Sequence, residues 1–565
     1  MNNHTIKVAC LQLKARPFSE QAENKENILQ FMKQAALSKP DLIVLPECIY
    51  PCYFLSPRII PGYSELANLI EQFLKEVQDY ARKYQTFLAL GLPEYNQEKN
   101  ELYNSALLID DEGREVGRVR KSFLWHFDHN WFRSGNHYPV FNTKIGKIGL
   151  FICADGRLPE IMRCLSLQGA EILLDLTNWI TSGLDRKAWS NPQAEYIIPT
   201  RALENKVWIV VANKIGYEEK SIQYCGKSAF FSPEGKTVMM ASPDQEEILV
   251  QEIDLSQSHQ KNIAGVIDVF QSRKPEQYHY LTLPTHQLPI WQKSKEKTNI
   301  IEENPFAAVI QIGEPPDQGL SAYLSKIEYF FHTLAEQEVH IFSFSQINNF
   351  NAQQSAKILD FLKDLTKNYP SLCSIVLSEE ENSLKYKTIF LVQSGKIIGK
   401  YRKTHLEFSE KGQITPGENH FEVFKTQFGV IGMMLDYEGY FPEIARILTL
   451  KGAEIIIWPA QFSQDEHLKI GQTRSAENKI FIICPNSIQQ QGNGHSIITS
   501  PAGQIITGCL ENLEMASIAS ISPSLARDKT IVPHTHAILG RQPASYNLLT
   551  SPLPPLFQRE KVRIR

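Results

Sequence analysis

The chain has 565 residues and a net charge of −4, because its 62 Asp and Glu residues slightly outnumber its 58 Lys and Arg residues. A balance this close to neutral argues against a nucleic-acid or anionic-membrane binder, since such a protein normally needs a strongly basic face. Hydrophobic residues make up 42% and charged residues 21% of the chain, which excludes a disordered, collagen-like or disulfide-scaffold protein.

The cysteines and the N-terminal sequence indicate a compartment. The nine cysteines are odd in number and lie mostly in apolar runs, as expected of reduced thiols in a cytoplasm. Cys48 and Cys52 form one close pair, but no second pair follows at zinc-site spacing, so no metal site is predicted. The N-terminus lacks the features of a signal peptide, and no apolar run approaches the ~18 residues that span a bilayer. We therefore expect a soluble, cytoplasmic protein without a membrane or nucleic-acid partner.

From its first residues the chain alternates strand-like apolar runs with helical stretches. Strands are predicted over 6–12 and 41–47, and a third apolar run ends at Cys153. The Pro-Glu pair at 159–160 favours a helix start, because proline costs nothing in the first turn and Glu meets the positive end of the helix dipole. Gly169 is a natural helix stop. The alternation predicts an α/β fold with layered, mixed sheets.

An internal repeat divides the sequence. Eight blocks of the first half recur in the same order in the second half; for example, EGREVGRVRKSFL at 112–124 matches SGKIIGKYRKTHL at 394–406. Ordered matches of this kind predict two copies of one fold. The predicted domains are 1–285 and 304–565, and the polar segment 286–303 between them is predicted to be a linker.

Three residues with catalytic chemistry each stand at the end of a predicted strand: Glu47, Lys121 and Cys153. Strand ends of this kind converge at one rim of an α/β sheet, where such folds place their sites. The sequence after Cys153 places its thiol at a strand-to-helix elbow, where backbone N–H groups can stabilise an oxyanion. A lone buried cysteine is more often a packed apolar residue, and the other two residues make the catalytic interpretation the better one.

With these motifs, the first half resembles the nitrilase superfamily of carbon–nitrogen hydrolases over residues 6–281. The matching pieces are Leu-Pro-Glu at Glu47, Arg-Lys at 120–121, G-x-x-I-C-x-D-x-R-x-P-E at 149–160, and later blocks at 202–205 and 226–235. The resemblance implies an αββα sandwich, a Glu47–Lys121–Cys153 triad, and no metal or organic cofactor.

The resemblance also implies a role for each residue of the triad. Glu47 is the general base, Lys121 and the Ala154 backbone N–H stabilise the oxyanion, and Cys153 attacks the amide carbon to form a thioester that water hydrolyses. Family members usually carry a further Glu between the Lys and the Cys. Asp128 stands at that offset here, either as the orienting acid or as an exposed loop acid.

Other side chains flank the catalytic blocks and are candidates for binding the substrate, with ordinary core packing as the alternative for the aromatic ones. They are Tyr53, Asn178 and Trp179, together with Tyr50, Trp125 and His126. Arg157 has two interpretations: it meets a substrate carboxylate, or it forms a structural ion pair, which we favour from the sequence.

The second half keeps the predicted fold but lacks the catalytic set. Asp436 aligns with Cys153 and Gln346 with Glu47, while Lys403 is retained and Glu410 stands at the orienting-acid position. A carboxylate is a poor nucleophile towards an amide and a glutamine cannot act as a base, so we predict a degenerate domain in which Lys403 pairs with Asp436.

The second half is then expected to be a structural or regulatory partner. Members of the superfamily commonly dimerise and exchange C-terminal arms, so the resemblance implies that this tandem chain forms an internal pseudo-dimer and leaves a further homo-oligomer open.

The predicted activity is hydrolysis by water of a small linear amide or N-carbamoyl amine, with release of ammonia. Nitrile hydrolysis is less favoured, because members with that activity usually place Trp-Glu after the cysteine, where this chain has Ala154 and Asp155. The alternative from another class is a non-catalytic scaffold or binding protein of the same fold, and the intact Glu47, Lys121 and Cys153 argue against it.

Overall fold

The computed structural model describes residues 4–181, 183, 185, 189–293, 304–313, 319–347, 350–418, 420–488 and 492–552. By its internal packing the chain forms two compact units. The first comprises Met1–Lys261 with Thr530–Arg565, and the second comprises Asn262–Lys529. The boundaries of the units therefore differ from those of the repeat, because each unit includes the last segment of the other copy. Residues 294–303 of the predicted linker lie outside the described residues.

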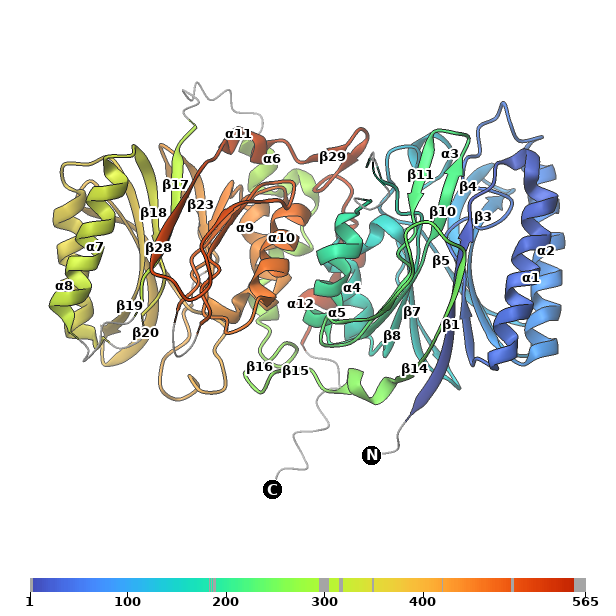
Figure 1. The fold of residues 1–565 in the computed structure, drawn as a ribbon, viewed down its shortest axis with the longest axis horizontal. Coiled ribbons are helices and arrows are strands. Elements are labelled where there is room, and N and C mark those ends of the chain that lie inside the picture. Colours follow the sequence, from blue (N-terminus) through green and yellow to red (C-terminus); the bar gives the residue numbers. More distant parts are fainter. Residues whose placement is uncertain are drawn as a thin grey trace. The chain divides into compact units, whose positions relative to one another are not determined.

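Two mixed sheets form the first unit (Figure 1). One sheet has the order β11-β10-β1-β2-β3-β4-β5, with β14 also paired to β1, and the other has the order β13-β12-β9-β8-β7-β6. The strands of the first sheet are β1 (Thr5–Lys14), β2 (Leu42–Val44), β3 (Phe87–Asn96), β4 (Glu101–Ile109), β5 (Glu115–Arg120), β10 (Lys214–Glu218), β11 (Ile222–Cys225) and β14 (Glu247–Asp254). Those of the second are β6 (Val140–Thr143), β7 (Gly146–Ile152), β8 (Ile172–Leu176), β9 (Trp208–Ala212), β12 (Ala229–Phe231) and β13 (Thr237–Met240).

Helices cover the outer face of each sheet, so the layers run α, β, β, α (Figure 1). The helices α1 (Gln21–Ala35) and α2 (Tyr63–Tyr84) pack on the first sheet, and α4 (Pro159–Leu167) and α5 (Ile198–Asn205) on the second. The buried face of α2 has apolar residues at helical spacing, namely Leu66, Ile70, Phe73 and Val77. Gly169, just after α4, has φ +92°, as its prediction as a helix stop requires.

The same layers recur in the second unit, which confirms the predicted α/β fold of two sandwich halves. Its sheets have the orders β21-β20-β19-β18-β17-β28 and β22-β23-β24-β25-β26-β27. Their strands are β17 (Phe306–Gln311), β18 (Val339–Phe344), β19 (Leu372–Glu381), β20 (Leu384–Gln393), β21 (Lys396–Arg402), β22 (Phe424–Thr426), β23 (Gly429–Met433), β24 (Ile455–Ile457), β25 (Phe481–Cys484), β26 (Ile497–Thr499), β27 (Ile505–Gly508) and β28 (Met515–Ser520). The main helices are α7 (Leu320–Ala335), α8 (Ala352–Thr366), α9 (Pro442–Leu450) and α10 (Glu466–Asn478).

The segments that complete the two units make matching contacts. We call residues 530–552, which include β29 (Thr530–Val532), β30 (Thr535–His536) and α12 (Asn547–Thr550), the C-terminal arm. In the first unit Arg541 of this arm pairs with Glu160 of α4, with Nε and Oε1 3.1 Å apart. In the second unit Arg273 pairs with Glu443 of α9 at 3.2 Å. Each half of the chain thus supplies an anchor for the other half's sandwich.

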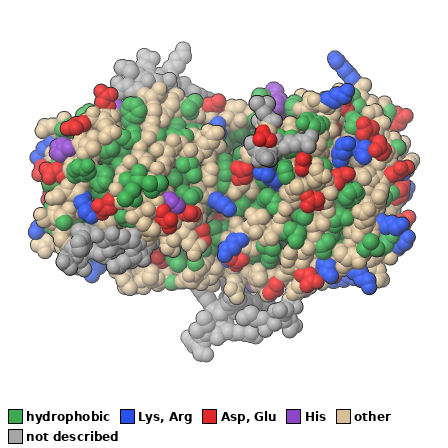
Figure 2. All heavy atoms as spheres, in the orientation of Figure 1, with side chains coloured by type: hydrophobic (Ala, Val, Ile, Leu, Met, Phe, Trp, Pro, Cys, Tyr) green, Lys and Arg blue, Asp and Glu red, His purple; other side chains and the backbone are tan. Residues whose placement is uncertain are grey.

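Positive and negative side chains alternate over the face of the molecule that Figure 2 shows, in keeping with the near-neutral composition. Among the described residues, none of the helices combines the length and the apolar character needed to cross a membrane.

Candidate active site

Three of the predicted side chains meet in one buried cluster of the first unit. Lys121 Nζ lies 2.7 Å from Glu47 Oε1 and 2.8 Å from Asp128 Oδ2. Glu47 follows β2, Lys121 follows β5, and Asp128 begins the short helix α3 (Asp128–Trp131). Glu47 and Asp128 are 0% exposed, so Asp128 is not an exposed loop acid. The geometry instead fits the orienting-acid interpretation, because Asp128 fixes the ammonium group of Lys121.

Asp128 is itself held by two donors. The Tyr53 hydroxyl donates to Oδ1 at 2.7 Å, and the backbone N–H of Trp125 donates to Oδ2 at 2.8 Å. Tyr53, a predicted substrate-binding residue, therefore directs its hydroxyl to Asp128. These two hydrogen bonds, together with the contact to Lys121, keep both Asp128 and its loop in place.

Glu47 has one engaged and one free oxygen. Asn104 Nδ2 donates to Oε1 at 2.6 Å, the same oxygen that Lys121 contacts, whereas Oε2 is buried and has no hydrogen-bond partner among the described residues. Burial raises the pKa of Glu47, Lys121 lowers it and Asp128 raises it again, so that the net shift is upward. A carboxylate with a free oxygen and a raised pKa is suited to accept a proton.

Cys153 occupies the predicted elbow between β7 and the 3-10 helix η3 (Cys153–Arg157). Its φ is +50°, a left-handed conformation that is unusual for a residue with a side chain. The Cys153 N–H donates to Oδ1 of Asp175 on β8 at 2.9 Å, which holds the elbow against the neighbouring strand. Burial and the charge of Glu47 raise the pKa of the Cys153 thiol while Lys121 lowers it, so the thiol is neutral at neutral pH and needs a base.

Asp155 ties the elbow to the end of β5. Its Oδ2 accepts the Ile152 N–H at 3.2 Å, and its Oδ1 accepts the N–H groups of Ser122 at 3.1 Å and Phe123 at 2.8 Å. The carboxylate therefore connects the residue before Cys153 to the two residues after Lys121. Ala154, 1% exposed, is the second residue of η3, so its N–H lies in the first turn, where backbone donors are free to meet an anion.

The remaining candidates form two groups. Some lie near Cys153, and others belong to the hydrophobic core. The Gln193 side-chain amide, oriented so that both its groups are satisfied, donates to Cys153 O at 3.1 Å and accepts from Trp179 Nε1. Asn178 is 6% exposed, and neither its Oδ1 nor its Nδ2 has a partner among the described residues. Tyr50 stacks on Phe73 with ring centroids 4.5 Å apart, which places its ring in the core.

Arg157 makes no ion pair with any described carboxylate, so the ion pair favoured from the sequence is wrong. Its guanidinium stacks on the ring of Trp125, with Cζ 4.7 Å from the centroid. Burial lowers its pKa, opposed by Tyr196 and by Cys153. The physical reason for the correction is that the guanidinium lies against the ring of Trp125 and has no carboxylate of the described residues within ion-pair distance.

The corresponding place in the second unit is filled by ion pairs. Lys403 Nζ lies 2.9 Å from Asp436 Oδ2, which confirms the predicted pair, and Lys387 Nζ lies 2.7 Å from the same oxygen. Although burial acts to raise it, these two ammonium groups hold the pKa of Asp436 below its ordinary value. Asp436 keeps the elbow conformation of Cys153, with φ +50°. The fold of the site is retained, but Asp436 is an ionised acid with both oxygens engaged.

Two further acids lie at this place in the second unit. Glu407 and Glu410 join Asp436 in a group of carboxylates whose oxygens lie within 4.8 Å of one another. Lys403 Nζ sits among them, 2.7 Å from Glu407 and 2.8 Å from Glu410, so a cation is already supplied by the protein.

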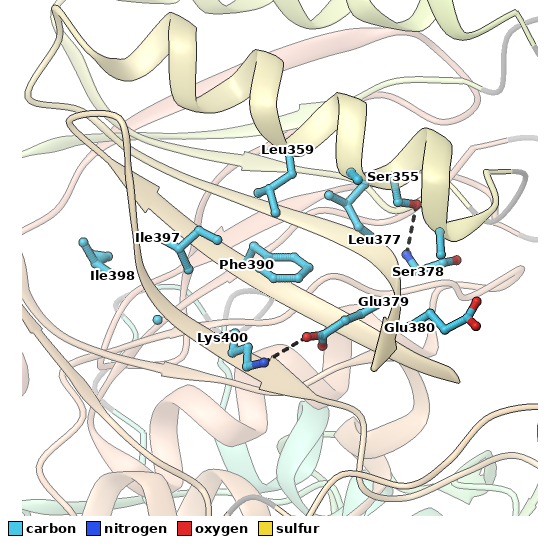
Figure 3. A pocket seen from close by; sticks show the side chains of 13 residues that line it. Ser355, Leu359, Leu377, Ser378, Glu379, Glu380, Phe390, Ile397, Ile398 and Lys400 are labelled. Atoms are coloured by element: carbon cyan, nitrogen blue, oxygen red, sulfur yellow. Dashed lines mark hydrogen bonds and ion pairs between the residues drawn. The ribbon is translucent and has the colours of Figure 1, made fainter. Parts of the chain in front are cut away.

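A separate groove of about 600 Å³ lies beside α8 in the second unit (Figure 3). Its lining is mainly apolar and includes Leu359, Leu377, Phe390 and Ile397. Its charged residues are Glu379, Glu380 and Lys400, and Glu379 pairs with Lys400 at 2.8 Å. No cysteine is among the residues that line this groove.

Comparison with known proteins assigns this sequence to a family. A sequence model described as carbon-nitrogen hydrolase matches residues 7–261 and 319–529. The chain belongs to the carbon-nitrogen hydrolase family. The two matched regions fall one in each repeat, so this hydrolase carries the family's sequence twice.

Curated relatives of the hydrolase match about half of its chain. The nitrilase of Pyrococcus abyssi is 32% identical over 276 residues, which is 48% of this chain and 99% of the relative. The N-carbamoylputrescine amidase of Oryza sativa is 26% identical over 46% of this chain and 90% of its own. The omega-amidase NIT3 of Saccharomyces cerevisiae is 28% identical over 44% and 87%. Among solved structures, a carbon-nitrogen hydrolase from Helicobacter pylori has 25% identity and a TM-score of 0.41, covering 46% of this chain and 92% of its own.

The prediction that Glu47 is the general base, together with its raised pKa, leads to an expected pH dependence of the hydrolase. A base must be unprotonated to work, so we expect kcat/KM to fall as the pH decreases through the pKa of Glu47, above the value of about 4.3 typical of an exposed Glu. A pH profile of kcat/KM measures this acid limb. A limb at or below the exposed value would contradict the assignment of the buried Glu47 as the base.

Proposed function

We propose that the first unit hydrolyses a small linear amide or N-carbamoyl amine through a thioester on Cys153 and releases ammonia. The observation that carries the proposal is the buried cluster of Glu47, Lys121 and Asp128, in which the charges of Glu47 and Lys121 act on a cysteine held at a strand-to-helix elbow. Base, cation and thiol are the three groups that acyl transfer through a cysteine requires.

The first half of the reaction forms the acyl-enzyme. The free Oε2 of Glu47 takes the thiol proton while the sulfur of Cys153 attacks the carbonyl carbon of the amide. The negative charge that develops on the carbonyl oxygen meets the ammonium group of Lys121 and the backbone N–H of Ala154. The proton passes from Glu47 to the leaving nitrogen, the C–N bond breaks, and ammonia departs from the thioester.

The second half regenerates the enzyme. Water gives a proton to Glu47 and its oxygen attacks the thioester carbon, and the C–S bond then breaks as the sulfur recovers a proton. Lys121 remains charged throughout: burial lowers its pKa, but Asp128 and Glu47 raise it, and the net shift is well upward. Its role is thus electrostatic stabilisation rather than proton transfer.

Ammonia release from a panel of linear amides, N-carbamoyl amines and nitriles tests this proposal. We expect turnover of amides or carbamoyl compounds, and a mass increase on Cys153 equal to the acyl group when the reaction is quenched. Turnover of nitriles alone would replace the amide assignment. No turnover and no acyl adduct with any compound would favour the non-catalytic scaffold.

We further propose that the preferred substrate carries a carboxylate. Arg157 is a half-buried guanidinium without an acidic partner among the described residues, and its charge acts on Cys153. A buried cation normally requires a compensating charge, which a substrate carboxylate would supply.

Replacing Arg157 with glutamine should separate charged from neutral substrates. Loss of a charge-assisted hydrogen bond is expected to raise KM for a carboxylate-bearing amide roughly tenfold or more, with KM for a neutral amide of equal length unchanged. Arg118→Gln is the matched control, because Arg118 pairs with Glu115 on the surface of the first sheet. An equal rise of KM for both amides would contradict the carboxylate assignment.

The second unit is proposed to lack this activity. Gln346 replaces the base, and Asp436 replaces the nucleophile and is neutralised by Lys387 and Lys403. The second repeat would then serve the first structurally, and the predicted internal pseudo-dimer stays a prediction.

A further inference from the structure

The loop after β5, residues 122–135, carries Asp128 and is contacted by the C-terminal arm. The Thr535 hydroxyl donates to Leu124 O at 3.1 Å and accepts the His126 N–H at 2.8 Å. Thr535 is 1% exposed and lies 411 positions from Leu124 in the sequence. One buried hydroxyl therefore fixes two backbone groups on either side of Trp125.

Trp125 connects this contact to the catalytic cluster. Its backbone N–H, between the two groups that Thr535 binds, donates to Asp128 Oδ2, and the same oxygen contacts Lys121 Nζ. The path from the hydroxyl of Thr535 to the ammonium of Lys121 thus consists of hydrogen bonds and one short loop. A displacement of the loop would move the carboxylate that orients Lys121.

Two other contacts hold the same loop against the arm. Gly540 packs so closely on Phe123 that a Cβ at this glycine would lie 2.3 Å from the ring. Near the other end of the loop, Gln542 Nε2 donates to Ser134 Oγ at 3.2 Å. The arm therefore restrains both ends of the loop that contains Asp128.

The second unit provides an internal comparison. Aligning RKPEQYHYL at 273–281 with RQPASYNLL at 541–549 places Ile267 where the arm has Thr535. Isoleucine has no hydroxyl, and the loop that carries Glu407 is held there by a backbone contact in which Phe408 N–H donates to Val266 O at 2.9 Å. The two hydrogen bonds of the Thr535 hydroxyl are therefore found in the unit that contains Cys153, and the aligned Ile267 cannot make them.

We propose that Thr535 is a positioning residue for the reaction at Cys153, so that the C-terminal arm of the second repeat completes the active site of the first. The inference rests on the proposed function for its kinetic consequence. Its physical reason is that Asp128 orients Lys121 effectively only if the loop is held, since small displacements of groups in an active site reduce rates strongly.

The test uses Thr535→Val in the full chain, because valine keeps the shape and removes both hydrogen bonds. We expect kcat to fall roughly ten- to a hundredfold with KM nearly unchanged. Thr535→Ser keeps the hydroxyl and should restore kcat. Thr550→Val is the matched control, since Thr550 of the arm donates to Asn547 O within α12 and to no other of the described residues, and it should behave as the wild type.

A pH profile and hydrogen exchange separate positioning from a general loss of stability. Asp128 raises the pKa of Glu47, so a displaced Asp128 should move the acid limb of kcat/KM to lower pH in Thr535→Val. Amide exchange in residues 122–135 should become faster in this variant and return to normal in Thr535→Ser.

The outcomes for the proposed function and for the positioning role are distinct. A wild-type protein without turnover would remove the proposed function. In that case, faster amide exchange of residues 122–135 in Thr535→Val than in the wild type and in Thr535→Ser would still support the positioning role of the arm. Wild-type kinetics and wild-type exchange in Thr535→Val would overturn the inference, as would a kcat that Thr535→Ser fails to restore.

Discussion

Cys153→Ala is expected to reduce ammonia release by a factor on the order of 10⁴ or more, to the background of the assay, because the variant has no atom that can form the thioester. Base, cation and backbone donors remain in place, so substrate binding should persist. Steady-state turnover and the acyl adduct measured by mass spectrometry check the two consequences separately.

A buried cysteine of the second unit offers the matched control. Cys373 lies on β19 and is fully buried, as Cys153 nearly is, but belongs to the other sandwich. Cys373→Ala should retain turnover, so a loss confined to Cys153→Ala identifies the nucleophile rather than a general effect of removing a thiol. Substantial turnover in Cys153→Ala would show that the reaction does not depend on Cys153.

Glu47→Gln is the second change with a large expected effect. Glutamine preserves the shape and keeps an oxygen for Asn104 and Lys121, but it cannot take the proton of a neutral thiol. Loss of a general base typically costs about 10² to 10⁴ in rate, and we expect a decrease of that size in kcat/KM. The second repeat already contains this substitution, at Gln346, in an intact sandwich.

The acid limb of the pH profile distinguishes the base from a structural residue. In Glu47→Gln the limb assigned to Glu47 should disappear from the residual activity, because no group with that pKa remains. Glu115→Gln, at an acid that pairs with Arg118, is the control and should leave both rate and profile unchanged. An unchanged acid limb in Glu47→Gln would assign it to another group.

Much of this site could be predicted because its residues stand in sequence blocks that directly follow strands. Glu47, Lys121 and Cys153 each lie immediately beyond an apolar run, and the topology of an α/β sheet brings such positions together. The role of Asp128 was ambiguous from the sequence, because an acid in a loop between strands is buried or exposed depending on which other segments pack over it. In the fold Asp128 is buried and accepts a hydrogen bond from Tyr53, which lies in a different loop.

Other residues of the site carry no signal in the sequence. Asn104, Asp175 and Gln193 lie within ordinary strand and helix sequence, and they contact Glu47 or Cys153 only after distant strands have paired. The ion pair of Arg157 was predicted from the motif in which this arginine stands. The motif does not show which side chains surround the guanidinium in the folded protein, so the prediction was wrong.

By itself, the sequence determined that the chain is two copies of one α/β fold. It also determined that the first copy has Glu47, Lys121 and Cys153 together, whereas the second keeps only the lysine. Repeats and residue types can be read from the sequence without coordinates. The tertiary structure decided which acid orients Lys121, that Arg157 lacks an acidic partner among the described residues, and that Thr535 of the last segment contacts the loop of the first copy. These depend on burial and on hydrogen bonds between segments hundreds of residues apart, and spacing along the chain contains no information about such contacts.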